Sequence, residues 1–378
     1  MIKRMVIAFL AVVVLVLCLP LIHHAIHLLT PAPVVNRDSE AWKARVALIA
    51  RAKVFVTPAP AIPGLDLSHP SNDAHPLDGA TSVECRYVPR PNTGTTPKFF
   101  CRLPDGNIIK VKYGPTPERL AETAATRLLA ALGFGADRVT LLPRLRCLGC
   151  PAHPYESRQL AERYFASWLF DLFTGGDKPQ DFSWVSAERK LPGRAIEVDG
   201  FEGWDYYELD GVDPAKGGAT RAEVDALKLI AIFVGHWDNK SNNQRLVCEE
   251  GAGDGDPAAP CATPLLMLQD VGSTFGPSSV DESHWAATPI WADPGRCEVA
   301  LGHSDKSTEV IPISEPGRQL LATKLRQLSE AQIGTIFRSA GFPDPSTGGD
   351  GRVTLWVKVF EDKVRQIADR PACPAVAK

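Results

Sequence analysis

The hydrophobic positions of the chain follow different patterns along its length, and the first is a continuous apolar run. Residues 5–22 carry no charged side chain, and two basic residues, Lys3 and Arg4, precede them. Roughly 18 apolar residues is about the shortest length that spans a bilayer, and basic residues before such a run keep the N-terminus in the cytoplasm. The pattern predicts a signal anchor within residues 1–30, or a cleaved signal peptide. Either one exports the rest of the chain.

The segment after this run, residues 31–81, is rich in proline and predicts a linker. It holds one amphipathic pattern, which predicts a helix over residues 39–54. Alternating polar and apolar residues then predict three strands, over residues 82–90, 98–103 and 107–113. In the third strand the period of two places Lys110 and Lys112 on the face opposite Ile109 and Val111.

A helical repeat follows the third strand. Thr116 is a suitable N-cap, Pro117 suits the first helical position and Gly133 ends the pattern. Glu122 projects from the apolar side of this helix, where an unpaired carboxylate would be costly. A lysine of the preceding strand is therefore the natural partner of Glu122.

The remainder of the chain is mainly helical in pattern. Residues 222–234 read as a buried helix, and Ser329 and Gln332 form a capping box at the start of a helix that ends at Gly341. Further helices are predicted over residues 156–173 and 353–368. Residues 204–209 are strand-like, and residues 272–316 are predicted to be rich in loops.

Composition and charge narrow the class of protein. A hydrophobic content of 44% is ordinary for a globular protein, so disorder is not expected. The formal net charge of -3 gives no electrostatic reason to expect nucleic acid as a partner. At 378 residues, the chain is long enough for two packed lobes.

Eight of the nine cysteines lie beyond the apolar run, and an even number in an exported chain indicates disulfides. Spacing alone does not fix the connectivity, but local closure favours one set of pairs: Cys85–Cys101, Cys147–Cys150 and Cys248–Cys261, with Cys297–Cys373 left over. The C-x-x-C spacing of the second pair also suits zinc or redox chemistry. A zinc site is not favoured, because the exported part offers no second C-x-x-C or H-x-x-x-H.

The most informative polar segment follows the helix at residues 222–234. It runs from His236 through Asp238 and Lys240 to Asn243, and Asp270-Val-Gly272 comes later in the chain. Phosphoryl transfer needs these residue types: a carboxylate that accepts the substrate's proton, a cation for the developing charge, and oxygen ligands for Mg²⁺. The segment therefore predicts a phosphotransfer centre.

The order of these features resembles that of the protein kinase-like superfamily, over roughly residues 82–275. The nearer likeness is to atypical members, the HipA-type kinases and the secreted Golgi-type kinases. The resemblance implies ATP and Mg²⁺ as cofactors. Asp238 would be the catalytic base and Lys240 a charge stabiliser, while Asn243 and Asp270 would be the Mg²⁺ ligands.

In the first lobe the resemblance implies residues that bind the nucleotide. The turn around Gly94 would cover the phosphates, and Lys112, or failing that Lys110, would contact them and pair with Glu122. The chain departs from the family's pattern in having a single glycine in this turn. An insert also separates Asp238 from Asp270, and a Cys248–Cys261 bond would close that insert as a hairpin.

These features together predict an α+β, two-lobed protein kinase-like fold behind a membrane anchor. The small lobe of β-sheet and one helix would span residues 82–150, and the larger, mainly helical lobe residues 151–376. The predicted function is that of a single-pass, extracytoplasmic phosphotransferase acting on a protein or small hydroxyl substrate. The alternatives are an inactive kinase-like scaffold of the cell envelope and a nucleotidyl transferase.

Overall fold

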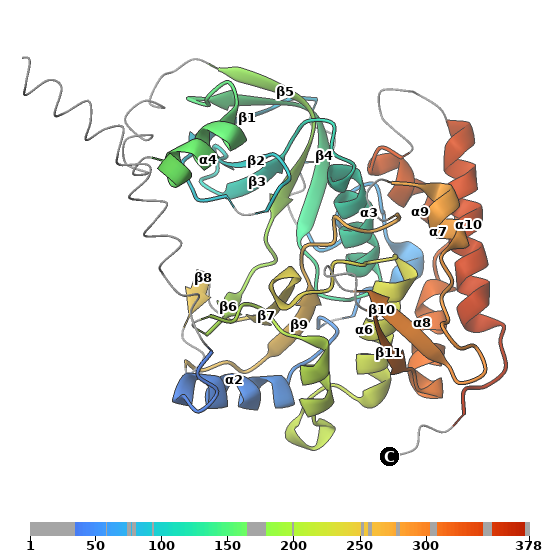
Figure 1. The fold of residues 1–378 in the computed structure, drawn as a ribbon. Helices are drawn as coiled ribbons and strands as arrows, with labels where there is room; N and C mark the ends of the chain where they lie inside the picture. Colours follow the sequence, from blue (N-terminus) through green and yellow to red (C-terminus); the bar gives the residue numbers. More distant parts are fainter. Residues whose placement is uncertain are drawn as a thin grey trace, which may run out of the picture. The chain divides into compact units, whose positions relative to one another are not determined.

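The computed structural model describes residues 35–57, 59–73, 77, 81–92, 94–164, 179–198, 200–250, 253–255, 259–276, 280–302, 308–342 and 350–374. The fold is of mixed α+β class (Figure 1). The anchor predicted within residues 1–30 lies outside the described residues. In the described part of the chain, no helix combines the length and the apolar character needed to cross a membrane.

Internal contacts divide the chain into two compact units. The first unit includes residues 80–114 and 142–185, and the second unit comprises residues 34–79, 115–141 and 186–378. Both units are discontinuous in sequence, whereas the sequence predicts two continuous lobes. The segment 115–141, which carries the helix with Glu122, groups with the second unit.

The first unit is built on strands that pair in both antiparallel and parallel fashion. Three of them are β1 (Val83–Val88), β2 (Lys98–Arg102) and β3 (Ile108–Lys112), within the three predicted ranges. Two long strands that the sequence pattern does not predict, β4 (Arg138–Leu148) and β5 (Gln180–Arg189), close a barrel in the order β1-β2-β3-β5-β4. Helix α4 (Pro154–Tyr164) contacts β2.

The inner face of these strands is filled by the apolar members of each alternating pair. Phe99 and Val111 are fully buried, and Phe99 packs against the rings of Tyr87, Tyr113 and Phe182. Lys112 is also buried, at 1% exposure, although the alternation predicts it on the opposite face from Val111. A cation with so little contact with water is costly to bury, so its environment must compensate for the charge.

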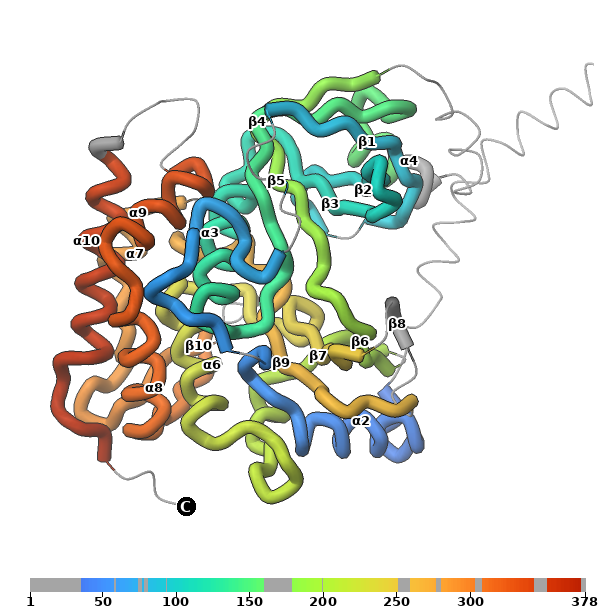
Figure 2. Tube along the Cα trace, turned by 180° about the vertical axis from the view of Figure 1, so that it is seen from behind, coloured from blue at the N-terminus to red at the C-terminus, as the bar shows by residue number. Residues whose placement is uncertain are grey.

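The second unit contains a four-stranded sheet in the order β8-β6-β7-β9. Its strands are β6 (Arg194–Ile196), β7 (Gln244–Cys248), β8 (Gly253–Gly255) and β9 (Pro264–Leu268). Strands β7 and β9 are antiparallel, and every residue of both is buried. Helix α2 (Glu40–Ala50), capped by Ser39, lies within the predicted range 39–54 and contacts β9 (Figure 2).

Helices form most of the remaining regular structure of the second unit. They are α3 (Glu118–Ala131), α6 (Arg221–Phe233), α7 (Glu282–Ala287), α8 (Glu315–Leu325), α9 (Glu330–Ser339) and α10 (Asp350–Ala368). Figure 2 shows α10 beside α8 and α9, in agreement with their contacts. Their core is a group of aromatic rings in which Phe275, Trp285 and Trp356 pack edge to face or stacked.

The sequence prediction fails in two places in this unit. Residues 204–209 are not a strand: a 3-10 helix spans Tyr206–Gly211, because Asp205 and Glu208 form a capping box around its first turn. The region 272–316 is more regular than expected. It holds α7 and a hairpin of β10 (Glu298–Gly302) and β11 (Thr308–Pro312).

Short 3-10 helices complete the described elements, at Ile62–Gly64, Pro214–Lys216 and Ser241–Asn243. Four disulfides join the cysteine pairs that local closure favours: Cys85–Cys101, Cys147–Cys150, Cys248–Cys261 and Cys297–Cys373. The predicted pairing is confirmed. The first two disulfides lie in the first unit and the last two in the second unit.

Candidate functional site

The hairpin of β7 and β9 brings together residues that the insert separates in sequence. Its register pairs Gln244 with Leu268, so the residue before β7 lies beside those that follow β9. The carbonyl of Asn243 accepts hydrogen bonds from the backbone N–H of Gln269 (3.0 Å) and of Asp270 (3.3 Å). The insert lies at the other end of the hairpin, where the Cys248–Cys261 disulfide closes it. Asn243 and Asp270 are therefore neighbours.

The loop between α6 and β7 is organised around Asp238. The amide Nδ2 of Asn243 donates to both the carbonyl and the Oδ2 of Asp238, each at 2.8 Å. The Nζ of Lys240 lies 3.1 Å from the same Oδ2. Asn243 uses its amide nitrogen on Asp238, and its amide oxygen, an acceptor, takes no part in these two bonds. Asp238, Lys240 and Asn243 thus form one connected group.

The second carboxylate oxygen of Asp238 differs from the first. Oδ1 is buried and has no hydrogen-bond partner in the described part of the chain. Leaving a buried acceptor unsatisfied costs about 1–3 kcal/mol. Such an atom is suited to accept a hydrogen bond from a hydroxyl group that enters the site.

His236 supports the backbone at Asp270. Its Nε2 lies 3.2 Å from the carbonyl oxygen of Asp270. A carbonyl oxygen only accepts, so Nε2 carries the proton and donates it to this bond. Burial lowers the pKa of His236, although the charges of Asp270 and Asp238 oppose that effect. The imidazole is therefore neutral at pH 7, and it ties the end of α6 to the residue after β9.

Asn239 fixes the loop from the opposite side. Its Nδ2 donates to the carbonyls of His236 (2.6 Å) and Gly302 (2.8 Å), and its Oδ1 accepts from the hydroxyl of Tyr206 (3.1 Å). Sequence reasoning did not identify the roles of Asn239 and Tyr206. The only signal is the sequon Asn239-Lys240-Ser241, and the burial of Asn239 at 1% exposure leaves no room for a glycan in the folded chain.

The predicted nucleotide-binding residues are divided between the two units. Gly94, Lys110 and Lys112 belong to the first unit, and Glu122 belongs to the second unit. Glu122 is buried on α3 at 1% exposure, as its position on the helix predicts. Of the two lysines, Lys112 is buried and Lys110 is half-buried. The pairing of Lys112 with Glu122 stays a prediction.

The turn that carries Gly94 is held by a helix of the same unit. Gly94 has φ 76°, a conformation that glycine adopts without strain. Its carbonyl accepts a hydrogen bond of 2.7 Å from the hydroxyl of Tyr155, near the start of α4. The backbone N–H of Tyr155 in turn donates to the hydroxyl of Tyr113, next to β3. The sequence gives no sign of this connection.

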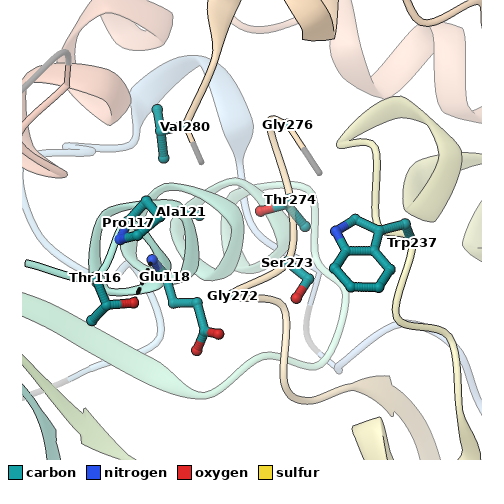
Figure 3. Close-up of a pocket in the computed structure, with 10 residues that line it drawn as sticks. All are labelled: Thr116, Pro117, Glu118, Ala121, Trp237, Gly272, Ser273, Thr274, Gly276 and Val280. Carbon is teal, nitrogen blue, oxygen red and sulfur yellow. Dashed lines mark hydrogen bonds between the residues drawn. The ribbon is translucent and has the colours of Figure 1, made fainter. Parts of the chain in front are cut away.

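A cavity of about 210 Å³ lies in the second unit beside the loop (Figure 3). The start of α3, Trp237 and the segment after Asp270 line it, with these residues: Thr116, Pro117, Glu118, Ala121, Trp237, Gly272, Ser273, Thr274, Gly276 and Val280. Sites for drug-sized ligands measure about 300–1,000 Å³. The cavity is therefore too small for a whole nucleotide, and it suits a side chain or a small polar group.

The donor set around Asn243 and Asp270 fits a hard divalent cation. A carboxylate and a carboxamide oxygen are ligands that Mg²⁺ accepts, and the backbone bond between these two residues keeps them together. Within the second unit the residues present are therefore compatible with Mg²⁺.

Comparisons with known proteins give only weak similarities. No model of a known protein family matches the chain, and no curated protein matches it. Among solved structures, the chain is similar to the crystal structure of CtkA, a proinflammatory kinase of Helicobacter pylori. The TM-score is 0.45 and the identity 11%, over 76% of this chain and 97% of that chain. At this level the match does not decide between functions, which depend on the geometry of the site.

Proposed function

We propose that the protein is a kinase-like phosphotransferase that uses Mg²⁺ and ATP to phosphorylate a hydroxyl group of a protein or small molecule. The observation that carries the proposal is the closure of the β7–β9 hairpin. It brings Asp270 next to Asn243 and hence to Asp238 and Lys240. The four residue types that phosphoryl transfer requires meet at one end of one hairpin, despite the insert between them.

In this proposal the substrate hydroxyl donates a hydrogen bond to Oδ1 of Asp238. As its oxygen forms a bond to the γ-phosphorus, the bond from that phosphorus to the β-phosphate oxygen breaks, and Asp238 takes the hydroxyl proton. Lys240 stabilises the negative charge on the transferred group. Its ammonium is close to the reacting hydroxyl because it lies 3.1 Å from Asp238. Asn243 keeps Asp238 oriented through its two hydrogen bonds.

When bound, Mg²⁺ would neutralise charge on the β- and γ-phosphates, and Asn243 and Asp270 are the residues that would hold it. His236 would keep Asp270 in place through the backbone carbonyl of that residue. Gly94, Lys110, Lys112 and Glu122 are proposed to contact the nucleotide. The cavity beside Trp237 is proposed to receive part of the substrate.

Replacing Asp270 tests this function. The variant Asp270→Ala loses a charged metal ligand, so Mg²⁺-dependent transfer should fall by about 10²–10³-fold, a loss typical of removing an electrostatic group from a catalytic site. The matched control is Asp38→Asn, because Asp38 is exposed and lies before α2. Transfer at the wild-type rate in Asp270→Ala would exclude the assignment.

One observation favours the alternative of a kinase-like binding protein without turnover. The single glycine of the phosphate-covering turn has its carbonyl fixed by Tyr155, which restrains a segment that must close over phosphates. Thermal unfolding with Mg²⁺ and ATP separates the two functions. A ligand raises the apparent stability as RT ln(1 + [L]/Kd), about 2.7 kcal/mol at 100 times Kd. Unchanged unfolding at millimolar ATP would favour the binding protein.

The location of the protein is a further part of this proposal. We place the described domain outside the cytoplasm, anchored through the apolar run at residues 5–22. The four disulfides support an oxidising compartment, because such bonds rarely persist in a reducing one. Protease treatment of cells whose outer layers are opened but whose cytoplasmic membrane is intact would test the location, since an extracytoplasmic domain is then digested and a cytoplasmic one is protected.

A further inference from the structure

Two disulfides of the first unit lie in contact with one another. Cys85–Cys101 joins β1 to β2, and Cys147–Cys150 joins the end of β4 to the turn that follows it. The Sγ atoms of Cys101 and Cys147 are 3.8 Å apart. The Sγ atoms of Cys85, Cys101 and Cys147 all lie within 4.8 Å of one another. Cys150 is bonded to Cys147, so its Sγ adjoins this group of three.

Strand pairing explains why these four cysteines meet. Strand β1 lies between β2 and β4, and its parallel register with β4 sets Cys85 directly opposite Cys147. On all three strands the cysteine is one of the buried residues in the pattern of buried and more exposed positions. Gly149, with φ 69°, then turns the chain so that Cys150 returns to Cys147. The cluster is therefore set by the backbone of the barrel.

The arrangement has the dimensions of a tetrahedral metal site. Zinc binds thiolate at about 2.3 Å, which separates two ligands of a tetrahedron by about 3.8 Å. The distance between Cys101 and Cys147 already has this value. The sulfurs within each pair need to separate from a bond of about 2.0 Å to the same distance, and side-chain rotation provides such a shift. The sequence lacks a second C-x-x-C, but the fold supplies the missing ligands through Cys85 and Cys101.

We propose that the reduced protein binds one soft divalent cation, such as zinc, through Cys85, Cys101, Cys147 and Cys150. The first unit then has two alternative cross-links, a pair of disulfides under oxidising conditions and a Cys₄ metal centre under reducing conditions. Thiolates are the ligands that select zinc over magnesium or calcium. All four sulfurs are shielded from water, with Cys150 the most exposed at 7%.

Conversion of the two disulfides into four thiols requires an external reductant. A phosphine attacks each disulfide, takes up oxygen from water to become the phosphine oxide, and the two hydrogens of that water become the protons of two thiols. Binding of the divalent cation to four thiols then releases up to four protons. The metal site is therefore expected to bind more tightly as the pH rises.

Cobalt titration of the reduced, full-length protein tests the proposal. With a phosphine reductant present under anaerobic conditions, we expect one equivalent of Co²⁺ to give sulfur-to-cobalt charge-transfer absorption and the visible bands of tetrahedral coordination. Zinc should displace the cobalt and bleach both. A reduced wild-type protein without these bands would overturn the proposal.

Two sets of variants assign the bands to the cluster. Cys101→Ser and Cys150→Ser each remove one ligand and should abolish the tetrahedral spectrum. The double variant Cys248→Ser/Cys261→Ser is the control, because Cys248, Glu250 and Cys261 form a second group of three ligand atoms within 4.8 Å. It should keep the spectrum. Loss of the bands in this control, with retention in Cys101→Ser, would assign the metal elsewhere and overturn the proposal.

A measurement on the wild-type protein guards against variants that fail to fold. The reduced protein is alkylated with and without zinc, and the modified cysteines are identified by mass spectrometry. Zinc should protect Cys85, Cys101, Cys147 and Cys150 and leave the labelling of Cys248, Cys261, Cys297 and Cys373 unchanged. Labelling of the first four that does not respond to zinc would contradict the proposed site.

Discussion

The two carboxylate oxygens of Asp238 have different surroundings, and this difference defines its proposed role. Oδ2 accepts from Asn243 and pairs with Lys240, whereas the buried Oδ1 has no partner in the described part of the chain. An amide in place of this carboxylate keeps the shape but cannot take a proton at neutral pH. We therefore expect Asp238→Asn to lower kcat by about 10²–10⁴-fold, the usual contribution of a general base.

The KM for ATP should change little in Asp238→Asn, because this residue contacts the substrate hydroxyl and not the nucleotide. Steady-state kinetics with saturating Mg²⁺ measures both constants, and Asp38→Asn serves again as the exposed control. An unchanged kcat would show that proton transfer does not pass through Asp238.

Lys363 on α10 is a buried cation of the second unit that the proposed chemistry does not use. Its side chain is 1% exposed, donates to the carbonyl of Thr288 at 2.7 Å and lies over the ring of Trp285. Burial lowers the pKa of Lys363 to about 8, from 10.5. Below pH 8 Lys363 is charged in both the folded and the unfolded chain, and burial of this charge destabilises the folded chain.

The pH dependence that follows has a definite sign. Between pH 8 and 10.5 the unfolded chain binds more protons at this residue than the folded chain, so the free energy of unfolding should rise with pH, by about 3 kcal/mol over the whole range. Urea unfolding at pH 7.5 and 9.5 measures the rise. Lys363→Met should remove it, and Lys358→Met, at an exposed position of the same helix, should not. Equal slopes in the wild type and Lys363→Met would contradict the assignment.

At the scale of elements, Gly203 sets how closely two segments of the second unit approach. It has φ 67°, and a Cβ atom there would lie 2.1 Å from the carbonyl oxygen of Ser241 and 2.2 Å from that of Gln244. Both neighbours are backbone of the segment that leads from Lys240 into β7. An alanine at this position would therefore displace the segment that holds Asn243.

We expect Gly203→Ala to lower the free energy of unfolding by about 2 kcal/mol or more, as backbone strain combined with a steric clash usually does. Transfer activity should fall with it, because Asn243 orients Asp238. Gly211→Ala is the control, since no neighbouring atom lies within 4 Å of a Cβ atom at Gly211. Wild-type stability in Gly203→Ala would show that the two segments can separate without cost.

Elements with strong local patterns could be predicted from the sequence. Strands β1 to β3 follow strict alternation, and α9 begins at the Ser329–Gln332 capping box that the sequence shows. Strand β4 is not predictable from the local pattern, because it contains Pro143, which argues against a strand, and because its partner β1 lies far away in sequence. The aromatic segment at 204–209 favours a strand by composition, but the local capping by Asp205 and Glu208 outweighs that preference.

The candidate site could be predicted in part, for a similar reason. The spacing of Asp238, Lys240 and Asn243 is local, so their mutual contacts follow from one loop. Their approach to Asp270 depends on the β7–β9 register, which the expected Cys248–Cys261 bond indicates but does not fix. The contacts of Asn239 with Tyr206 and Gly302 join segments far apart in sequence, and no local pattern encodes them.

For the whole molecule, we predict that phosphotransferase activity needs both units. The residues that would hold Mg²⁺ and accept the proton belong to the second unit, and Gly94, Lys110 and Lys112 belong to the first unit. The disulfides are confined within each unit, so each can be cross-linked without fixing the other. A measurement of phosphoryl transfer therefore depends on residues of both units, whereas the stability of a single variant reports on one unit.

The most direct measurement compares two labels in one reaction. The full-length, oxidised protein is incubated with Mg²⁺ and ATP labelled on either the γ- or the α-phosphate, and the label on the protein or an added hydroxyl substrate is counted. The account predicts transfer from γ-labelled ATP that is lost in Asp270→Ala and kept in Asp38→Asn. Transfer from α-labelled ATP alone would indicate a nucleotidyl transferase. The absence of transfer from either label would contradict the proposed phosphotransferase.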